Sequence, residues 1–442
     1  MVNSEWPRVT IESLIASGAI IAHKDGNYGS LYPRVEEFGT VGVPFLTAKS
    51  IINGNVNIDG APRLADGRAD SLRFGSVLPD DVLLSHNATI GRVAIVPEFN
   101  GRLVVGTSLT YFRLDARKLL PRYFAAYLEG ADFQNQLAAV MSHSTRNQVP
   151  ITAQRTLTVI VPPLGVQEMI ARTLRTLDDK IDQNRRTSRT SERLARAVFK
   201  AWFMDFEPVK AKAAGATSFP GMPQAAFDAL PSRLVDSELG PVPEGWTVGK
   251  MRDVGQPRRE QMTPEETDGD TPYIGLEHMP RRDVALAEWG SAATVTSSKF
   301  RFRRGDVLFG KLRPYFHKVG LAPVAGVCST DIVVLHPKSS DWMAWLLMLV
   351  SSDDFVAHTD RSSAGTKMPR TNWSDMAAFT TPLPPSSLAG AYQREAGPML
   401  ELITASIHES RTLAELRDYL LPRLLSGKVR VMDLQIGNEV TA

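Results

Sequence analysis

The chain has 442 residues, of which 43% are hydrophobic and 22% charged, and its formal net charge is +2. This composition is ordinary for a globular protein with ample core, and the length suits more than one domain. The single cysteine, Cys328, excludes an internal disulfide and a metal cage made of cysteines. The start of the chain does not resemble a signal peptide, and the longest apolar run, 342–350, is about half a membrane span. We therefore expect a cytoplasmic protein without a membrane segment.

Residues 1–160 form the first predicted domain. Short apolar runs are broken by Gly, Asn, Asp and Pro, which is typical of strands and turns. A helix is expected over 121–141, because Pro121 suits the first turn of a helix. This half is therefore predicted to be mixed α and β.

A long helix is predicted over 161–206, because nothing after the prolines at 162 and 163 breaks it. Its apolar residues follow a spacing of four, three and four, which forms one stripe along a helix. The stripe then becomes polar at Asn184. The pairing residues on this helix are predicted to be Ile170, Leu174, Leu177, Ile181 and Asn184.

The second half of the chain repeats this order. A connector rich in Ala, Pro and Gly (207–243) precedes a second mixed domain (244–385), a second long helix (386–428) and a tail (429–442). The second helix carries a matching stripe, with predicted pairing residues Leu400, Ile403, Ile407 and Ser410. We expect the helices to pair antiparallel, with Asn184 and Ser188 opposite Ser410, as polar seam residues can fix register. The alternative is that each helix packs only on its own domain.

The two halves also share sequence. The segment 78–115 returns as 303–337, segment 144–181 returns as 364–403, and 5–15 returns as 245–255. The spacing of roughly 220 residues is too long for a solenoid repeat. We therefore predict an α+β protein with two homologous mixed α/β domains separated by two long helices that pair as an antiparallel coiled coil. Two similar domains in one chain are expected to read a target made of two parts.

Motifs for catalysis are incomplete. Residues 305–311 fit a phosphate-binding loop, but Leu312 replaces the hydroxyl that would bind magnesium and Pro314 disfavours the helix that should follow. The eight histidines lack the spacing of metal ligands. Asp81 and Asp306 occupy matching turns, where we expect them to accept hydrogen bonds from backbone N–H groups. No catalytic residue and no metal site are predicted.

Polar and basic loops at matching places are the candidate nucleic-acid contacts. Between Arg281 and Lys318 there are nine Lys or Arg against three Asp or Glu. Such a patch suits phosphates, Arg suits guanine, and Asn or Gln suits adenine. A plain solvated loop is the alternative reading at each position. The predicted DNA contacts are His86, Asn87, Arg92, Arg146, Asn147, Gln148, Lys311, Arg313, Tyr315, Lys318, Arg361, Lys367 and Arg370.

Three stretches carry a family resemblance: "GDVLFGKLRPYFHKVGLAP" (305–323), "TRNQVPITAQRTLTVIVPPLGVQEMIARTLRTLDDKID" (145–182) and "LRDYLLPRLLSGKV" (416–429). With the duplicated layout they make the chain resemble the specificity subunit of type I restriction-modification systems. The resemblance implies a non-catalytic subunit whose two target-recognition domains read a bipartite, asymmetric sequence in double-stranded DNA. The paired helices would set the gap between the two half-sites.

The resemblance also implies partners. Two modification subunits would carry S-adenosylmethionine and methylate adenine, and two restriction subunits would use ATP and Mg. The chain itself would hold no cofactor. Two other classes remain open: a protein scaffold that never binds DNA, and a restriction-modification enzyme fused into one chain, which the missing motifs disfavour.

Overall fold

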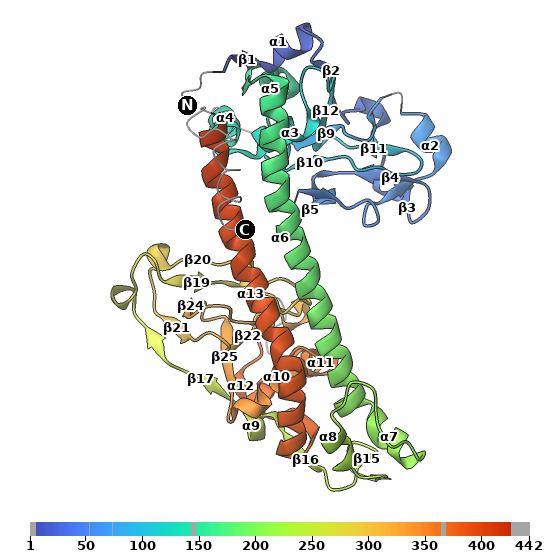
Figure 1. Cartoon of the computed structure of the whole chain (residues 1–442), viewed down its shortest axis with the longest axis vertical. Coiled ribbons are helices and arrows are strands. Elements are labelled where there is room, and N and C mark those ends of the chain that lie inside the picture. Colours follow the sequence, from blue (N-terminus) through green and yellow to red (C-terminus); the bar gives the residue numbers. More distant parts are fainter. Residues whose placement is uncertain (1–5, 53, 73, 143–146, 364–367, 426–442) are drawn as a thin grey trace, which may run out of the picture. The chain divides into compact units, whose positions relative to one another are not determined.

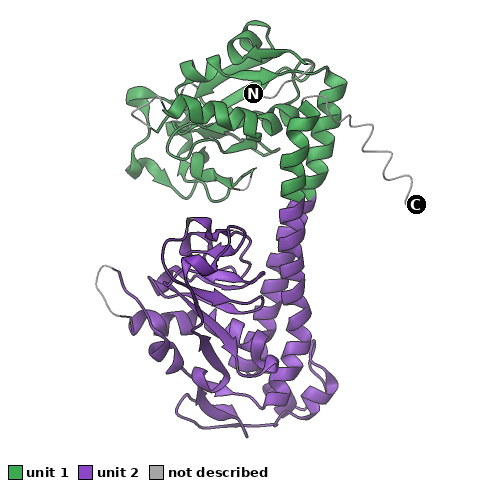
Figure 2. Cartoon of the chain, turned by 90° about the vertical axis from the view of Figure 1, so that its left-hand side faces the viewer, with its two compact units in different colours: residues 1–179, 413–442 green, residues 180–412 purple. Residues whose placement is uncertain are grey.

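The computed structural model describes residues 6–52, 54–72, 74–142, 147–363 and 368–425. The chain divides into two compact units, residues 1–179 with 413–442, and residues 180–412 (Figure 2). The division passes through the long helices α6 (Leu164–Phe199) and α13 (Ser386–Leu425), so both helices contribute residues to both units.

Two sheets lie in the first unit. The first sheet has the order β10–β9–β12–β2 and is antiparallel throughout. The second sheet has the order β3–β7–β4–β11–β8, in which only β4 and β11 run parallel. Two smaller sheets pair β1 with β13 and β5 with β6. The strands are β1 Arg8–Thr10, β2 Ile20–Asp25, β3 Phe38–Gly39, β4 Val43–Leu46, β5 Ile51–Ile52, β6 Asn55–Val56, β7 Arg63–Leu64, β8 Ser76–Val77, β9 Val82–Ser85, β10 Val93–Ile95, β11 Leu103–Val105, β12 Leu109–Leu114 and β13 Thr158–Ile160.

The helices of the first unit differ from the sequence prediction in one place. The expected helix over 121–141 is two helices, because Gly130 is extended with ψ of 151°. A β-carbon at Gly130 would lie 2.6 Å from Leu421 Cδ2 on α13, so a larger residue here would require the Leu421 side chain to move. The helices are α1 Ile11–Ala16, α2 Asp66–Asp70, α3 Pro121–Glu129, α4 Ala131–Ser142 and α5 Ile151–Thr156.

The second unit repeats the same two sheets (Figure 1). The order β23–β22–β25–β17 matches β10–β9–β12–β2, and β20–β19–β24–β21 matches β7–β4–β11–β8, with β19 and β24 as the parallel pair. The edge strand β18 and the pairs β14–β15 and β16–β26 complete it. The strands are β14 Leu234–Val235, β15 Val242–Pro243, β16 Thr247–Lys250, β17 Gly255–Arg258, β18 Gln261–Met262, β19 Pro272–Ile274, β20 Gly290–Ser291, β21 Lys299–Phe302, β22 Val307–Gly310, β23 Val319–Leu321, β24 Gly326–Cys328, β25 Ile332–Pro337 and β26 Thr380–Leu383.

The segment 207–243, predicted as a connector, is folded. Val209, Phe227 and Val242 are buried in the core of the second unit, so this segment packs on that unit rather than forming a loose linker. The apolar run at 342–350 is a buried helix, as expected. The helices are α7 Glu207–Ala213, α8 Gln224–Asp228, α9 Met251–Val254, α10 Met343–Val350, α11 Asp353–Arg361 and α12 Trp373–Ala377.

The central strands β9 and β22 are buried on both faces, which explains their continuous apolar sequence. In β9, Val82 and Leu84 join the core beneath the helices, while Leu83 joins the core shared with the second sheet. In β22, Val307 and Phe309 face one core and Leu308 the other. Alternate side chains of a strand point to opposite faces, so each unit is built in layers of helix, sheet and sheet.

Candidate nucleic-acid interface

The two candidate loops of the first unit lie side by side. Asn87, just after β9, forms an antiparallel bridge with Gln148, just before α5. The Val149 N–H donates to the His86 carbonyl at 2.9 Å. Segments about sixty residues apart in the sequence are thus joined into one surface at the end of the first sheet.

The two candidate loops of the second unit are joined in the same way. Leu312 and Arg370 form the equivalent antiparallel bridge, and the Thr371 N–H donates to the Lys311 carbonyl at 3.0 Å. The Arg313 N–H donates to the Pro369 carbonyl at 2.8 Å. The two units therefore carry one loop scaffold, built twice.

One backbone feature shows how closely the scaffolds match. Ala88 in the first unit and Arg313 in the second both have positive φ, 64° and 52°. This conformation is uncommon for residues other than glycine. The same backbone presents a methyl group in one unit and a guanidinium group in the other, so the two units offer different chemistry at one position.

His86 requires a correction, because it was expected on an exposed loop. The side chain is 1% exposed, and its ring lies 4.0 Å from the Asp25 carboxylate. Burial lowers the pKa of His86, so the imidazole is neutral at neutral pH. A side chain enclosed in this way does not present itself to a duplex.

The remaining candidates of the first unit fall into two groups. Asn147 is exposed, and Asn87 and Gln148, which bridge to each other, are half-buried. Arg92 is exposed, but its guanidinium donates to the carbonyls of Ala48 and Ile51 at 3.2 and 3.1 Å, which ties it to the protein. Arg146 lies outside the described residues.

The second unit presents more charge. Arg361 is exposed, Tyr315 is half exposed and Lys311 is partly buried. Arg370 is exposed and pairs with Asp331 at 3.2 Å. The Lys318 ammonium donates to the Leu276 carbonyl, and burial, together with nearby Arg281, lowers the pKa of this lysine. Lys367 lies outside the described residues.

Arg281 is a residue that the candidate set omitted. Its guanidinium carbon lies 4.0 Å from the centre of the Phe316 ring, beside Arg313 at 5.8 Å from the same ring. The excess of basic residues between 281 and 318 pointed to this region. The contact itself joins positions 35 apart in the sequence, for which no local pattern exists.

Asp81 and Asp306 hold the turns before β9 and β22, as expected. Each carboxylate accepts a backbone N–H three residues earlier, from Leu78 at 2.8 Å and from Arg303 at 2.7 Å. Each also pairs with an arginine of its own sheet, Asp81 with Arg113 and Asp306 with Arg258. Both acids are nearly fully buried and paired, so their role is structural.

Comparison with known proteins identifies the family. The model of the type I restriction modification DNA specificity domain matches residues 39–190 and 243–417, which is more than half of the chain. This chain belongs to that family. The two matched ranges fall one in each half of the internal repeat, so each half is a specificity domain in its own right.

Individual relatives are similar to this chain along nearly its whole length. The chain is 22% identical to the type I restriction enzyme HindI specificity subunit of Haemophilus influenzae, over 88% of this chain and 94% of that protein. It is 20% identical to the MjaIX specificity subunit of Methanocaldococcus jannaschii, over 91% and 90%. The crystal structure of the S subunit from M. genitalium has a TM-score of 0.54 at 13% identity, covering 96% of each chain, and shares the fold.

The predicted helix-pairing residues of this specificity-domain protein lie in the cores of both units. In the first unit Ile170 and Leu174 are buried and Leu177 is partly buried. In the second unit the buried residues are Ile181, Asn184, Leu400, Ile403 and Ile407. Asn184 donates to the carboxylate of Glu409, the neighbour of the predicted partner Ser410, at 2.8 Å.

The direction of pairing follows from two contacts within the second unit. Asn184 meets Glu409, and eleven residues further along α6 the Ala195 carbonyl accepts from the Tyr392 hydroxyl at 2.8 Å. Residue numbers rise on α6 while they fall on α13, so the helices run antiparallel. The middle of the seam is polar, since Ser188, Ser191 and Thr404 are buried there as well.

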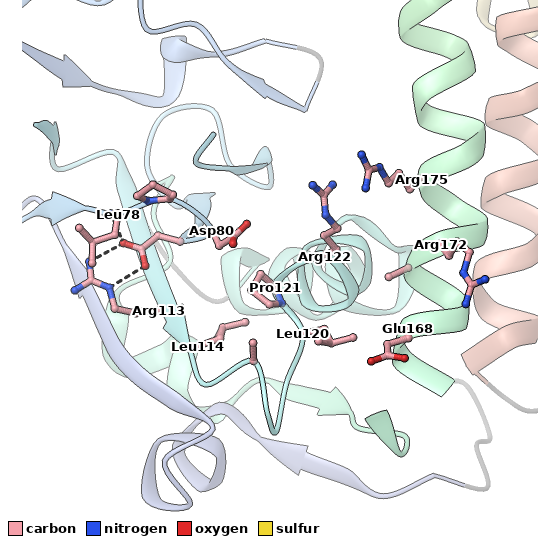
Figure 3. Close-up of a pocket in the computed structure, with 14 residues that line it drawn as sticks. Leu78, Asp80, Arg113, Leu114, Leu120, Pro121, Arg122, Glu168, Arg172 and Arg175 are labelled. Carbon is pink, nitrogen blue, oxygen red and sulfur yellow. Dashed lines mark hydrogen bonds and ion pairs between the residues drawn. The ribbon is translucent and has the colours of Figure 1, made fainter. Parts of the chain in front are cut away.

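A pocket of about 530 Å³ in the first unit lies between the turn before β9, the start of α3 and α6 (Figure 3). Apolar side chains including Leu114 and Leu120 line it, together with the basic side chains of Arg122 and Arg175. The ion-paired side chains of Asp81 and Arg113 also line the pocket. Among the described residues no group of three or more His, Cys, Asp or Glu could hold a metal ion, and no described helix is long and apolar enough to cross a membrane.

Proposed function

We propose that this chain is the non-catalytic specificity subunit of a cytoplasmic type I restriction-modification complex, in which each unit reads one half of a bipartite, asymmetric target in double-stranded DNA. The observation that carries the proposal is one loop scaffold built twice with different side chains. Ala88 and Arg313 share a backbone conformation, and amides on one unit replace cations on the other. Two half-sites of different sequence call for such a pair of surfaces.

Affinity and discrimination would come from different contacts. Lysine and arginine contacts to phosphates supply binding that is independent of sequence and sensitive to salt. Loop side chains that reach base edges supply discrimination. In this arrangement the amides of Asn87, Asn147 and Gln148 suit adenine, whereas the arginines of the second unit suit guanine.

Partner subunits would carry out the methylation and the cutting of DNA. Two modification subunits with S-adenosylmethionine would methylate adenine, after turning the base out of the duplex into their own pocket. Two restriction subunits with ATP and Mg would cut DNA. This chain would hold no cofactor and would bring those subunits to the target sequence.

The two long helices would set the gap between the half-sites, because both helices contribute to both units. The test removes seven residues from each helix at matching places, 178–184 from α6 and 410–416 from α13. Seven helical residues span about 10.5 Å, which corresponds to about three base pairs. The methylated motif should keep both half-sites and lose about three base pairs of gap.

A paired insertion of seven residues at the same places is the matched control, and it should lengthen the gap by the same amount. An unchanged gap in a soluble deletion variant that still methylates DNA would contradict the role of the helices as a spacer.

A further inference from the structure

The surface of the second unit carries a cluster that the family assignment does not explain. Arg281 stacks on one face of the Phe316 ring at 4.0 Å, and Arg313 lies 5.8 Å from the same ring. Tyr315 packs against Phe316 at a centroid distance of 4.8 Å, with half of its own surface exposed. Two arginines and a tyrosine thus surround one phenylalanine beside the paired candidate loops.

The loop beneath this cluster is held firmly from inside. The Phe316 N–H donates to the Arg313 carbonyl at 2.9 Å, and the His317 N–H to the Pro314 carbonyl at 2.8 Å. The His317 ring is 4% exposed and meets the Ser351 carbonyl at 2.9 Å. These bonds fix the backbone that carries Phe316.

The segment that carries Arg281 is anchored as well. The Arg282 N–H donates to the His317 carbonyl at 2.9 Å, which joins this segment to the loop. The N–H of Val284, which is fully buried, donates to the Glu192 carboxylate of α6 at 3.0 Å. Both partners of the stack are therefore placed by buried hydrogen bonds.

The Arg281 guanidinium differs from its basic neighbours in its polar contacts. Arg282 pairs with Asp353, Arg370 with Asp331, and Lys318 donates to a carbonyl. Within the described part of the chain, the exposed Arg281 side chain makes no hydrogen bond or ion pair. Its N–H donors therefore remain available to a ligand, while its guanidinium carbon lies over the Phe316 ring.

We propose that Arg281 reads a guanine in the half-site bound by the second unit, with Phe316 as its positioning residue. The inference rests on the proposed function, since it requires that the unit binds DNA. A guanidinium held over a ring has less freedom to move, and its planar fork matches N7 and O6 of guanine. A contact made only by charge, as with a phosphate, would not need this stack. The first unit has Ala88 at the place of Arg313 and no Phe, Tyr or Trp in the loop 86–92, so its half-site is read differently.

The experiment maps methylated adenines across the genome of a host that carries the chain with its modification subunit. The variants are Arg281→Ala, Arg281→Lys and Phe316→Leu, and Arg304→Ala, whose side chain pairs with Glu401, is the matched control. In Arg281→Ala, discrimination should fall about 5- to 150-fold at a single G·C pair of one half-site. Arg281→Lys should relax the same position, because lysine keeps the charge and loses the fork.

Phe316→Leu should relax that position partially, and Arg304→Ala should leave the motif unchanged. The other half-site is an internal control and should stay intact in every variant. A motif unchanged in Arg281→Ala, or a loss of methylation spread evenly over all sequences as expected for a phosphate contact, would overturn the proposal while leaving the proposed function in place. Absence of any motif with the wild-type chain would instead refute the proposed function.

Discussion

The contacts of Glu192 predict how much stability its replacement should cost. The carboxylate is 6% exposed, accepts the Val284 N–H at 3.0 Å and pairs with Arg196 at 2.7 Å. Arg196 in turn donates to the Ser351 carbonyl at 2.8 Å, the same oxygen that His317 meets. Glu192 is therefore linked to the candidate loop of the second unit through Arg196 and the Ser351 carbonyl.

Replacing Glu192 by alanine leaves a buried N–H without its acceptor and an arginine without its partner. Loss of the acceptor costs about 1–3 kcal/mol, and breaking a buried pair costs about 3–5 kcal/mol. The Arg196 side chain is 29% exposed, so water offsets part of the second cost. We expect a loss of about 2–4 kcal/mol in the free energy of unfolding for Glu192→Ala, and about 1–2 kcal/mol for Glu192→Gln, which keeps an acceptor for Val284.

Urea unfolding followed by tryptophan fluorescence measures this loss, because six of the seven tryptophans lie in the second unit. The matched control is Glu401→Gln, which removes an ion pair with Arg304. The Glu401 side chain is 73% exposed and the Arg304 side chain 58%, so the loss should be less than about 1 kcal/mol. A loss in Glu192→Ala no larger than that of the control would refute the reasoning.

Three further predictions concern stability. The pKa values of buried His23 and His86 are lowered in the folded chain, so the unfolded state binds more protons below about pH 6.5 and stability should fall as the pH drops through that value. His86→Gln should reduce the dependence of the unfolding free energy on pH, measured by urea titrations at pH 5–8. An unchanged pH dependence would contradict this prediction. Ile403→Ala should cost about 2–5 kcal/mol, since its side chain is 1% exposed in the core between helix and sheet, whereas alanine at exposed Leu402 should cost far less. Asn184→Ala should cost about 1 kcal/mol through loss of the bond to Glu409. A double-mutant cycle with Glu409→Ala measures the coupling between the two side chains, and a coupling energy of zero would contradict this prediction.

The repeated architecture could be predicted from the sequence because the residues that shape it recur. Asp81 and Asp306 accept backbone N–H groups at the same turn, and the apolar strands that follow are buried on both faces. The long helices could be predicted from their stripes, which need only local information. Helix α6 contains no proline, whereas α13 continues through Pro398 and Pro422.

Contacts that depend on distant segments could not be predicted in the same way. At the break at Gly130 the chain lies close to Leu421, almost three hundred residues later. His86 was expected at the surface because its loop is polar, yet the bridge from Asn87 to Gln148 helps to enclose it. The stack of Arg281 on Phe316 arises only when two loops meet.

The most direct test of the account is the methylation motif itself. The chain is expressed with its modification subunit in a host without other adenine methylation, and every methylated adenine is mapped. We predict one motif of two different half-sites separated by a fixed gap of unspecified bases. A single continuous motif, or no motif from a complex shown to be soluble and associated, would contradict it.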